Sequence, residues 1–139
     1  MPPAAADISS LLRTLVEHDV DFLVVGGVCA VLHGAPVSTF DLDIVPDRSE
    51  ENLVRLLHAL LSIDAVHRDL AGRSIAPDVS RLRGPGHNLF MTCSGPLDVF
   101  GTIGRGRDFS ALISRSRSVD VGDGLTVRVL DLDALIDVK

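Results

Sequence analysis

Aromatic residues are scarce in this sequence. Its 139 residues include five phenylalanines and neither tryptophan nor tyrosine. Hydrophobic residues still make up 46% of the chain, so the core must consist mainly of Leu, Val, Ala and Ile. This is enough apolar material for a sizeable core, and the length predicts a single domain over residues 1–139.

Cysteine is also rare, and long apolar runs are missing. Cys29 and Cys93 lie far apart, without the CxxC or Cys/His spacing of a zinc site. No apolar run approaches the roughly 20 residues that a membrane helix needs. The first residues lack the basic and apolar regions of a signal peptide. We therefore expect a cytoplasmic protein with reduced thiols and no membrane partner.

The net charge of −6 argues against a protein whose whole surface coats nucleic acid. A local basic cluster nevertheless occurs within residues 105–117, which contain four arginines and one acid. These residues can be solvated loops, or they can form a surface that receives phosphates. The composition leaves both interpretations open.

Hydrophobic periodicity predicts alternating helices and strands. Apolar residues at helical spacing, and short β-branched or alternating runs, mark the two kinds of element. The predicted helices cover residues 6–21, 28–34, 47–63, 108–116 and 130–139. The predicted strands cover residues 21–25, 40–45, 88–92 and 97–100, and a hairpin with an Asp-Gly turn spans 117–130.

Two helix starts carry capping residues, Asp7 or Ser9 for the first helix and Asp47 or Ser49 for the third. Residues 64–87 are rich in Gly, Pro and Arg, which predicts a flexible insertion or short edge strands. The order of elements predicts an α+β (α/β) fold, with a mixed sheet and helices packed mainly on one side.

Two aspartates, Asp41 and Asp43, lie one residue apart in an otherwise apolar strand. Residues i and i+2 of a strand project from the same face, with Cα atoms about 6.5–7 Å apart. Leu42 and Ile44 project from the other face, toward the core. Neighbouring carboxylates repel each other unless one is protonated or a cation lies between them. A divalent cation satisfies both, although a lone Asp-x-Asp also suits a half-exposed polar face.

A glycine pair, Gly26–Gly27, lies upstream of these aspartates, between a predicted strand and a predicted helix. Backbone N–H groups in such a turn bind phosphate well, and glycine allows a phosphate to approach the backbone closely. A phosphate-binding turn beside a metal-binding carboxylate pair is what a nucleoside triphosphate requires.

With these two motifs the chain resembles the nucleotidyltransferase superfamily, which has a DNA-polymerase-β-like fold. It is most similar to the small bacterial nucleotidyltransferases of toxin–antitoxin and abortive-infection systems. "FLVVGGVCAVLHG" and Asp41-Leu42-Asp43 carry the resemblance, which covers residues 7–60 well and 88–139 loosely. The family places a third carboxylate on a neighbouring strand, and Asp98 in "GPLDVF" matches it.

The resemblance implies Mg²⁺-dependent transfer of a nucleoside monophosphate from an NTP such as ATP. Asp41, Asp43 and Asp98 are then the catalytic and metal-binding residues of a two-metal site. Asp98 can also act as a base toward the acceptor hydroxyl. Gly26 and Gly27 are expected to bind the phosphates.

The chain departs from the family pattern at two positions, where Val37 and Phe40 replace basic residues. Ser38 and Thr39 remain as polar nucleotide-binding candidates. Lys139 can contact the phosphates or be a solvated terminal residue. Three other arginines can replace the missing cations, namely Arg73, Arg105 and Arg107.

A second Asp-Leu-Asp occurs at residues 131–133, where Asp131 precedes apolar residues at helical spacing and is expected to cap a helix. His33 is expected to be a surface or capping residue. The family usually continues into further helices, so the end at Lys139 indicates a minimal enzyme or part of a longer chain.

The resemblance leaves several functions open. The acceptor is a tRNA for the toxin-like class and a helical partner toxin protein for the antitoxin-like class. A minimal enzyme of this kind can also form a homo-oligomer. The main alternative is a degenerate fold that binds a nucleotide or a partner protein without catalysis. An antibiotic nucleotidyltransferase is less compatible, because that class usually has a second domain.

Overall fold

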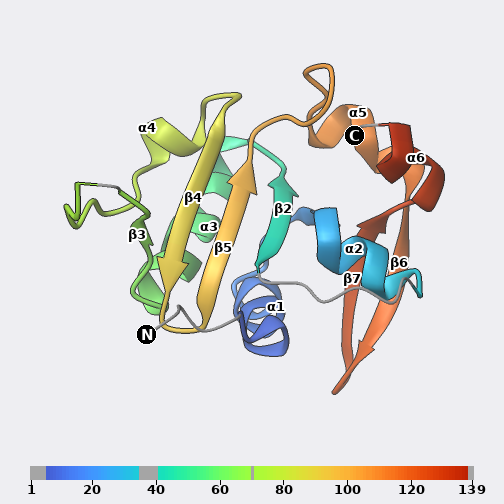
Figure 1. Cartoon of the computed structure of the whole chain (residues 1–139), viewed down its shortest axis with the longest axis horizontal. Helices are drawn as coiled ribbons and strands as arrows, with labels where there is room; N and C mark the ends of the chain where they lie inside the picture. The colour runs from blue at the N-terminus through green and yellow to red at the C-terminus, as the bar shows by residue number, and fades with distance from the viewer. Residues whose placement is uncertain (1–5, 35–40, 70, 138–139) are drawn as a thin grey trace.

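The molecule is built on one mixed sheet. A computed structural model describes residues 6–34, 41–69 and 71–137. The strands are β1 (Phe22–Val25), β2 (Leu42–Pro46), β3 (Val66–His67), β4 (His87–Thr92), β5 (Gly95–Phe100), β6 (Ser116–Gly122) and β7 (Leu125–Leu130). They follow the order β3-β4-β5-β2-β1-β7-β6 (Figure 1). β2 is parallel to β5 and β1 to β7, and the other neighbours are antiparallel.

The helices are short and begin at side-chain caps where the sequence offers them. They are α1 (Ile8–Glu17), α2 (Gly26–Leu32), α3 (Glu50–Ser62), α4 (Val79–Leu82), α5 (Phe109–Leu112), the 3-10 turn η1 (Ile113–Arg115) and α6 (Leu132–Asp137). Asp7 caps α1 by accepting from Ser10 N at 3.1 Å, and Ser49 caps α3. None of these described helices has the length and hydropathy that crossing a membrane requires.

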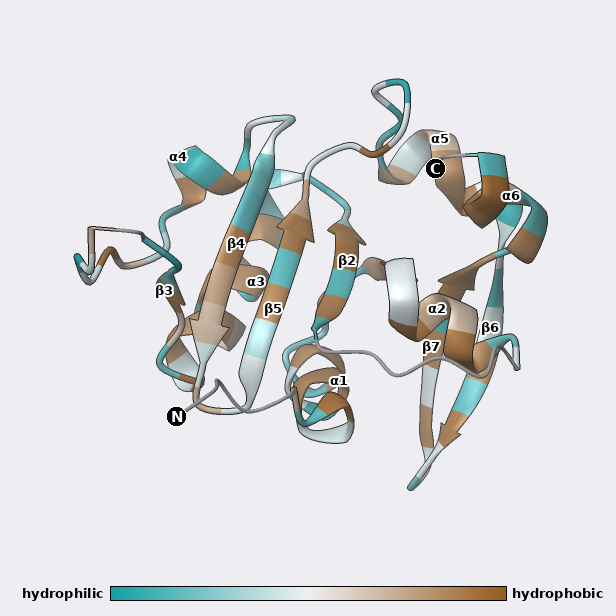
Figure 2. Ribbon diagram, viewed as in Figure 1, coloured by the Kyte–Doolittle hydropathy of each residue, from teal (hydrophilic) through white to brown (hydrophobic). Residues whose placement is uncertain are grey.

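The central strands are buried over most of their length. All four residues of β1 are buried, and so are most residues of β2 and β5. Figure 2 shows a hydrophilic band across each of β2 and β5. Each of these two strands contains one charged residue, Asp43 in β2 and Asp98 in β5. A charge inside a covered strand is costly unless it has a partner.

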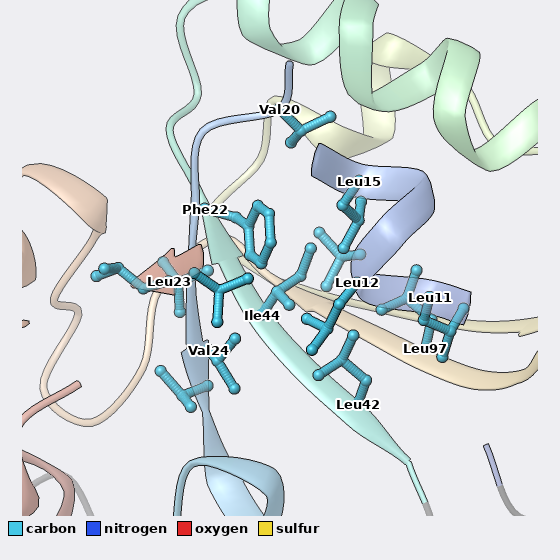
Figure 3. Close-up of a cluster of buried hydrophobic side chains, with 14 of the residues drawn as sticks. Leu11, Leu12, Leu15, Val20, Phe22, Leu23, Val24, Leu42, Ile44 and Leu97 are labelled. Carbon is cyan, nitrogen blue, oxygen red and sulfur yellow. The ribbon is translucent and has the colours of Figure 1, made fainter. Parts of the chain in front are cut away.

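The main core lies between α1 and the sheet. Leu11, Leu12 and Leu15 of α1 are at most 2% exposed, and they point toward side chains of β1 and β2 (Figure 3). Antiparallel pairing of Val24 with Ile44 places both on the same face of the sheet. Burying each such side chain contributes about 1.5–3 kcal/mol, so this core orients the two strands firmly.

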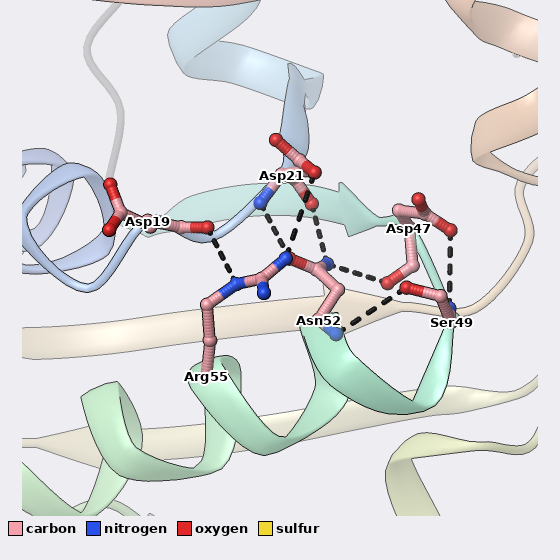
Figure 4. Close-up of polar contacts among 6 residues, drawn as sticks. All are labelled: Asp19, Asp21, Asp47, Ser49, Asn52 and Arg55. Atoms are coloured by element: carbon pink, nitrogen blue, oxygen red, sulfur yellow. Dashed lines mark hydrogen bonds and ion pairs between the residues drawn. The ribbon is translucent and has the colours of Figure 1, made fainter.

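A buried asparagine holds the start of β1 and the end of β2 in place (Figure 4). Asn52 of α3 is fully buried, and its Oδ1 accepts from Asp21 N at 2.7 Å. Its Nδ2 donates to the carbonyls of Asp21 at 2.9 Å and Asp47 at 2.6 Å. Arg55 Nε donates to the Asp19 carbonyl at 2.9 Å. These contacts tie α3 to the residue before β1 and the residue after β2.

The two longest helices, α1 and α3, contact each other and lie behind the sheet in Figure 1. α2 contacts β1, β2, β7 and α6, and it begins beside the Asp43 carboxylate on the opposite face. The α+β fold class with a mixed sheet is therefore confirmed.

The predicted elements correspond to the observed ones, with shifted ends. The hairpin β4–β5 and the Asp-Gly hairpin β6–β7 are both present. Within the ambiguous region 64–87, the edge-strand alternative is correct for β3, and the region also contains α4. α2 begins at Gly26, before the predicted start at residue 28, so the glycine pair belongs to the helix.

Candidate metal centre

Three carboxylates come together at the boundary of β2 and β5. Because these strands are parallel neighbours, Asp43 lies directly opposite Asp98, and Asp41 directly precedes β2. One carboxylate oxygen from each aspartate lies within 4.8 Å of the other two. Leu42 and Ile44 are fully buried on the other face, as the alternation predicts.

The cluster is unfavourable when all three groups are ionised and no cation is bound. Burial and, after it, the adjacent Asp41 raise the pKa of the Asp98 carboxyl to about 8. Burial also raises the pKa of Asp43 to about 6, again with a contribution from Asp41. The site therefore lacks positive charge for its number of acids.

The donor set fits a divalent cation. Asp43 Oδ1 is buried and accepts no hydrogen bond from any residue that the structure describes. A buried oxygen without a donor is costly, whereas a cation among three carboxylates would satisfy it. Mg²⁺ and Mn²⁺ prefer such oxygen ligands. Asp41, Asp43 and Asp98 are therefore the described residues that could hold a metal.

Gly26 is the residue that leaves room for the Asp43 carboxylate. Its φ of +69° favours glycine, and a Cβ at this position would collide with Asp43 Oδ2. Val25 pairs with Asp43 across the sheet, so the turn into α2 lies beside the cluster. Gly26 is thus adjacent to the Asp43 carboxylate, while the role of Gly26 and Gly27 in phosphate binding stays a prediction.

The sequence motifs did not identify Arg68, which lies at the cluster. Its guanidinium forms an ion pair with Asp98. Arg68 follows β3, in the region without clear periodicity, so no local signal points to it. Of the arginines that were predicted instead, Arg73 pairs with Asp69 at 2.6 Å. Arg105 and Arg107 lie in the connection between β5 and α5.

The other predicted site residues lie outside the described part of the chain. These are Ser38, Thr39 and Lys139, together with the departures from the family pattern at Val37 and Phe40. Their proposed contacts with a nucleotide stay predictions.

His33 has a structural partner. It follows the last residue of α2, and its Nε2 donates to the Leu130 carbonyl at 2.8 Å. Cys29 Sγ donates to the same carbonyl at 3.2 Å. Burial raises the pKa of the Cys29 thiol to about 11, which suits an unreactive core residue. Both side chains fasten α2 to the end of β7.

Comparisons with known proteins support the fold. No protein-family model and no curated protein matches this sequence. Among solved structures, the chain is similar to a Thermotoga maritima protein described as a candidate nucleotidyltransferase. The TM-score is 0.59 and the identity 17%, over 93% of this chain and 78% of the other. The chain therefore has a nucleotidyltransferase-like fold with three convergent carboxylates.

Proposed function

We propose that this protein is a metal-dependent nucleotidyltransferase. It would transfer a nucleoside monophosphate from an NTP to a macromolecular acceptor and release pyrophosphate. The observation that carries this proposal is the convergence of Asp41, Asp43 and Asp98 within 4.8 Å, on a sheet with this fold. The fold likeness supports a transferase, and the carboxylates supply its central chemical requirement.

In this proposal the three aspartates hold the divalent cations. When bound, such cations stabilise the charge that develops at the α-phosphorus. The acceptor oxygen forms a bond to that phosphorus, and the bond to the β-phosphate bridging oxygen breaks. Asp98, which lies beside the other two aspartates, accepts the proton of the acceptor hydroxyl. Gly26 and Gly27 let the polyphosphate approach the start of α2.

The acceptor belongs to the same proposal. By analogy with toxin–antitoxin nucleotidyltransferases, it is a tRNA or a hydroxyl group of a partner toxin protein. The basic residues within 105–117 would favour an RNA locally, and the net charge of −6 would oppose it.

A degenerate binding module is the second candidate. It is favoured by Val37 and Phe40, which stand where the family has basic residues. Such a module would bind a nucleotide or a partner protein without transferring a nucleotide.

The first experiment is a thermal-shift titration with each Mg²⁺–NTP. The wild type is compared with the double variant Asp41→Asn/Asp43→Asn and with Asp131→Asn/Asp133→Asn, which changes the same tripeptide elsewhere. Ligand at 100 times its Kd raises the stability by about 2.7 kcal/mol. We expect a metal-dependent shift that disappears only in the first variant.

Transfer is then measured with α-³²P-labelled NTP, using total tRNA and cell protein as acceptors. Label on either acceptor, lost in Asp41→Asn/Asp43→Asn, supports the enzyme. Nucleotide binding without label transfer would favour the degenerate module. A folded wild type that shows no shift with any Mg²⁺–NTP would refute both the enzyme and the nucleotide-binding form of the module.

A further inference from the structure

Arg68 reaches the carboxylate cluster along a row of residues that crosses the sheet. Asp43 pairs with Asp98 across β2 and β5, and Asp98 pairs with Leu89 across β5 and β4. Arg68 N then donates to the Leu89 carbonyl at 2.8 Å. Residues paired across strands project from the same face. The guanidinium is therefore positioned on the carboxylate face, where it meets Asp98.

The pair formed by Arg68 and Asp98 is more protected from water than the others. The Arg68 side chain is 31% exposed and that of Asp98 is 10% exposed. Of the ion pairs among the described residues, it alone has both side chains less than one third exposed. Exposed pairs are weak because water screens them, whereas this pair is partly desolvated. Its position points to a role at the cluster.

We propose that Arg68 is the internal counter-ion of the metal centre. In the metal-free protein its guanidinium holds the Asp98 carboxyl group, favours its carboxylate form and partly neutralises the three acids. It competes with a divalent cation for that carboxylate, and it binds the nucleotide polyphosphate once the cation is in place. Arg68 is thus a positioning residue in the free protein and a binding residue in the complex. This inference rests on the proposed function.

Charge explains why one arginine can serve in both states. Three ionised carboxylates and one guanidinium carry a net charge of minus two, which one divalent cation neutralises. A second cation would leave an excess of positive charge. The anionic polyphosphate would balance this excess. Guanidinium binds phosphate oxygens as readily as carboxylates, through paired N–H donors. Arg68 can therefore exchange Asp98 for phosphate without losing its hydrogen bonds.

The inference predicts opposite effects on two ligands. Removing a positive charge beside a metal ligand, as in Arg68→Gln, is expected to raise Mn²⁺ affinity about tenfold. The same variant is expected to weaken binding of ATP to the Mn²⁺-loaded protein about tenfold, because a charge-assisted phosphate contact is lost. Mn²⁺ binding is measured by electron paramagnetic resonance, and ATP binding by calorimetry on the full chain.

Two variants serve as controls. Arg68→Lys keeps the charge, so its Mn²⁺ affinity should stay close to that of the wild type. Arg73→Gln removes a charge from the same region at a side chain that is 71% exposed and pairs with Asp69. It should leave both affinities unchanged. If Arg68→Gln lowers or leaves unchanged the Mn²⁺ affinity, the counter-ion role is overturned.

A measurement on the wild type avoids reliance on variants that fail to fold. Phenylglyoxal modifies accessible arginines, and peptide mass analysis compares Arg68 with Arg73 as an internal reference. We expect Mn²⁺ to increase the relative modification of Arg68, and Mn²⁺ with ATP to reverse it. Unchanged modification of Arg68 on adding Mn²⁺ would contradict the exchange.

The outcomes separate this inference from the proposed function. If Arg68→Gln shows the opposite effects on Mn²⁺ and ATP but the wild type transfers no nucleotide, the proposed activity fails and the role of Arg68 stands. If it transfers nucleotide while Arg68→Gln shows no opposite effects, only the inference fails. Absence of Mn²⁺ binding by the wild type would overturn both.

Discussion

The tripeptide Asp-Leu-Asp occurs twice in this chain and has two different surroundings. At residues 41–43 it leads into β2, and its aspartates join Asp98 in a partly buried cluster. At residues 131–133 it leads into α6, where Asp131 accepts from Arg117 Nε at 2.9 Å. The Arg117 side chain is 62% exposed. The second motif therefore satisfies its charge at the surface, whereas the first lies in a cluster that contacts Arg68 and could hold a metal.

The residues after each motif explain the difference. Ile44 and Val45 follow the first motif, and β-branched residues favour a strand. Ala134 and Leu135 follow the second motif and favour a helix, in which they are buried. In the strand the two carboxylates share a face and have a third acid beside them on β5. An Asp-x-Asp pattern thus has chemical meaning only with its secondary structure and its neighbouring strand.

The largest expected effect is that of replacing the last aspartate of the first motif. The same replacement in the second motif serves as the comparison. Asp43→Asn should weaken Mn²⁺ binding by at least about 100-fold, because it removes a charged ligand at the centre of the cluster. Asp133→Asn changes an exposed residue at the start of α6 and should leave Mn²⁺ affinity unchanged. Calorimetric titration with Mn²⁺ gives both affinities. Equal losses in the two variants would remove the distinction between the motifs.

The glycine beside the first motif offers a second test. Gly26→Ala imposes a strained φ of +69° and a collision with the Asp43 carboxylate. Gly124→Ala imposes similar strain, with φ at +75°, but its Cβ meets open space. Strain alone costs roughly 1–2 kcal/mol, so Gly26→Ala should lose more stability in urea denaturation and also lose Mn²⁺ affinity. Similar losses in both variants would show that the close approach is unimportant.

A smaller effect is expected on the stability of the metal-free protein when the pH is changed. The pKa values of Asp43, about 6, and Asp98, about 8, exceed the ordinary value of 3.8. At pH values between the ordinary pKa and the raised ones, the folded protein therefore binds more protons than the unfolded chain. Its stability falls as the pH rises through this window. The Tm of the wild type should fall more between pH 5 and pH 8 than that of Asp43→Asn.

Mn²⁺ should restore much of this loss at pH 8, because it compensates the ionised carboxylates. The variant Asp131→Asn/Asp133→Asn serves as the control and should follow the wild-type pH profile. Identical profiles for the wild type and Asp43→Asn would contradict the proposed origin of the effect.

The smallest effect is expected in the second motif. Arg117→Gln breaks the exposed pair with Asp131 and should cost at most about 0.5 kcal/mol in urea denaturation. Mn²⁺ affinity should not change. A loss above about 2 kcal/mol would mean that this motif has a larger structural role than its exposure indicates.

Much of the fold follows from local patterns in the sequence. The leucines of α1 and α3, the caps at Asp7 and Ser49, and the Asp-Gly turn each act within a few residues. Alternation in β2 also predicts that Asp43 projects away from Leu42 and Ile44. These features are predictable because the forces that produce them act between residues close in sequence.

The site was only partly predictable. The resemblance to nucleotidyltransferases pointed to Asp98, but no local pattern places it beside Asp43. Arg68 was not identified, because the two-residue strand β3 that precedes it has no detectable period. The positions of Ser38, Thr39 and Lys139 lie outside the described residues, so their predicted roles stay predictions.

Local sequence patterns predicted most of the secondary structure and the common direction of the Asp41 and Asp43 carboxylates. The pairing of strands in three dimensions established that β5 lies parallel to β2, which places Asp98 opposite Asp43. It also decided that β3 and β4 continue the sheet and carry Arg68 to the same cluster. The physical reason is that hydrogen bonds between strands join residues distant in the chain, and local periodicity does not specify which strands become neighbours.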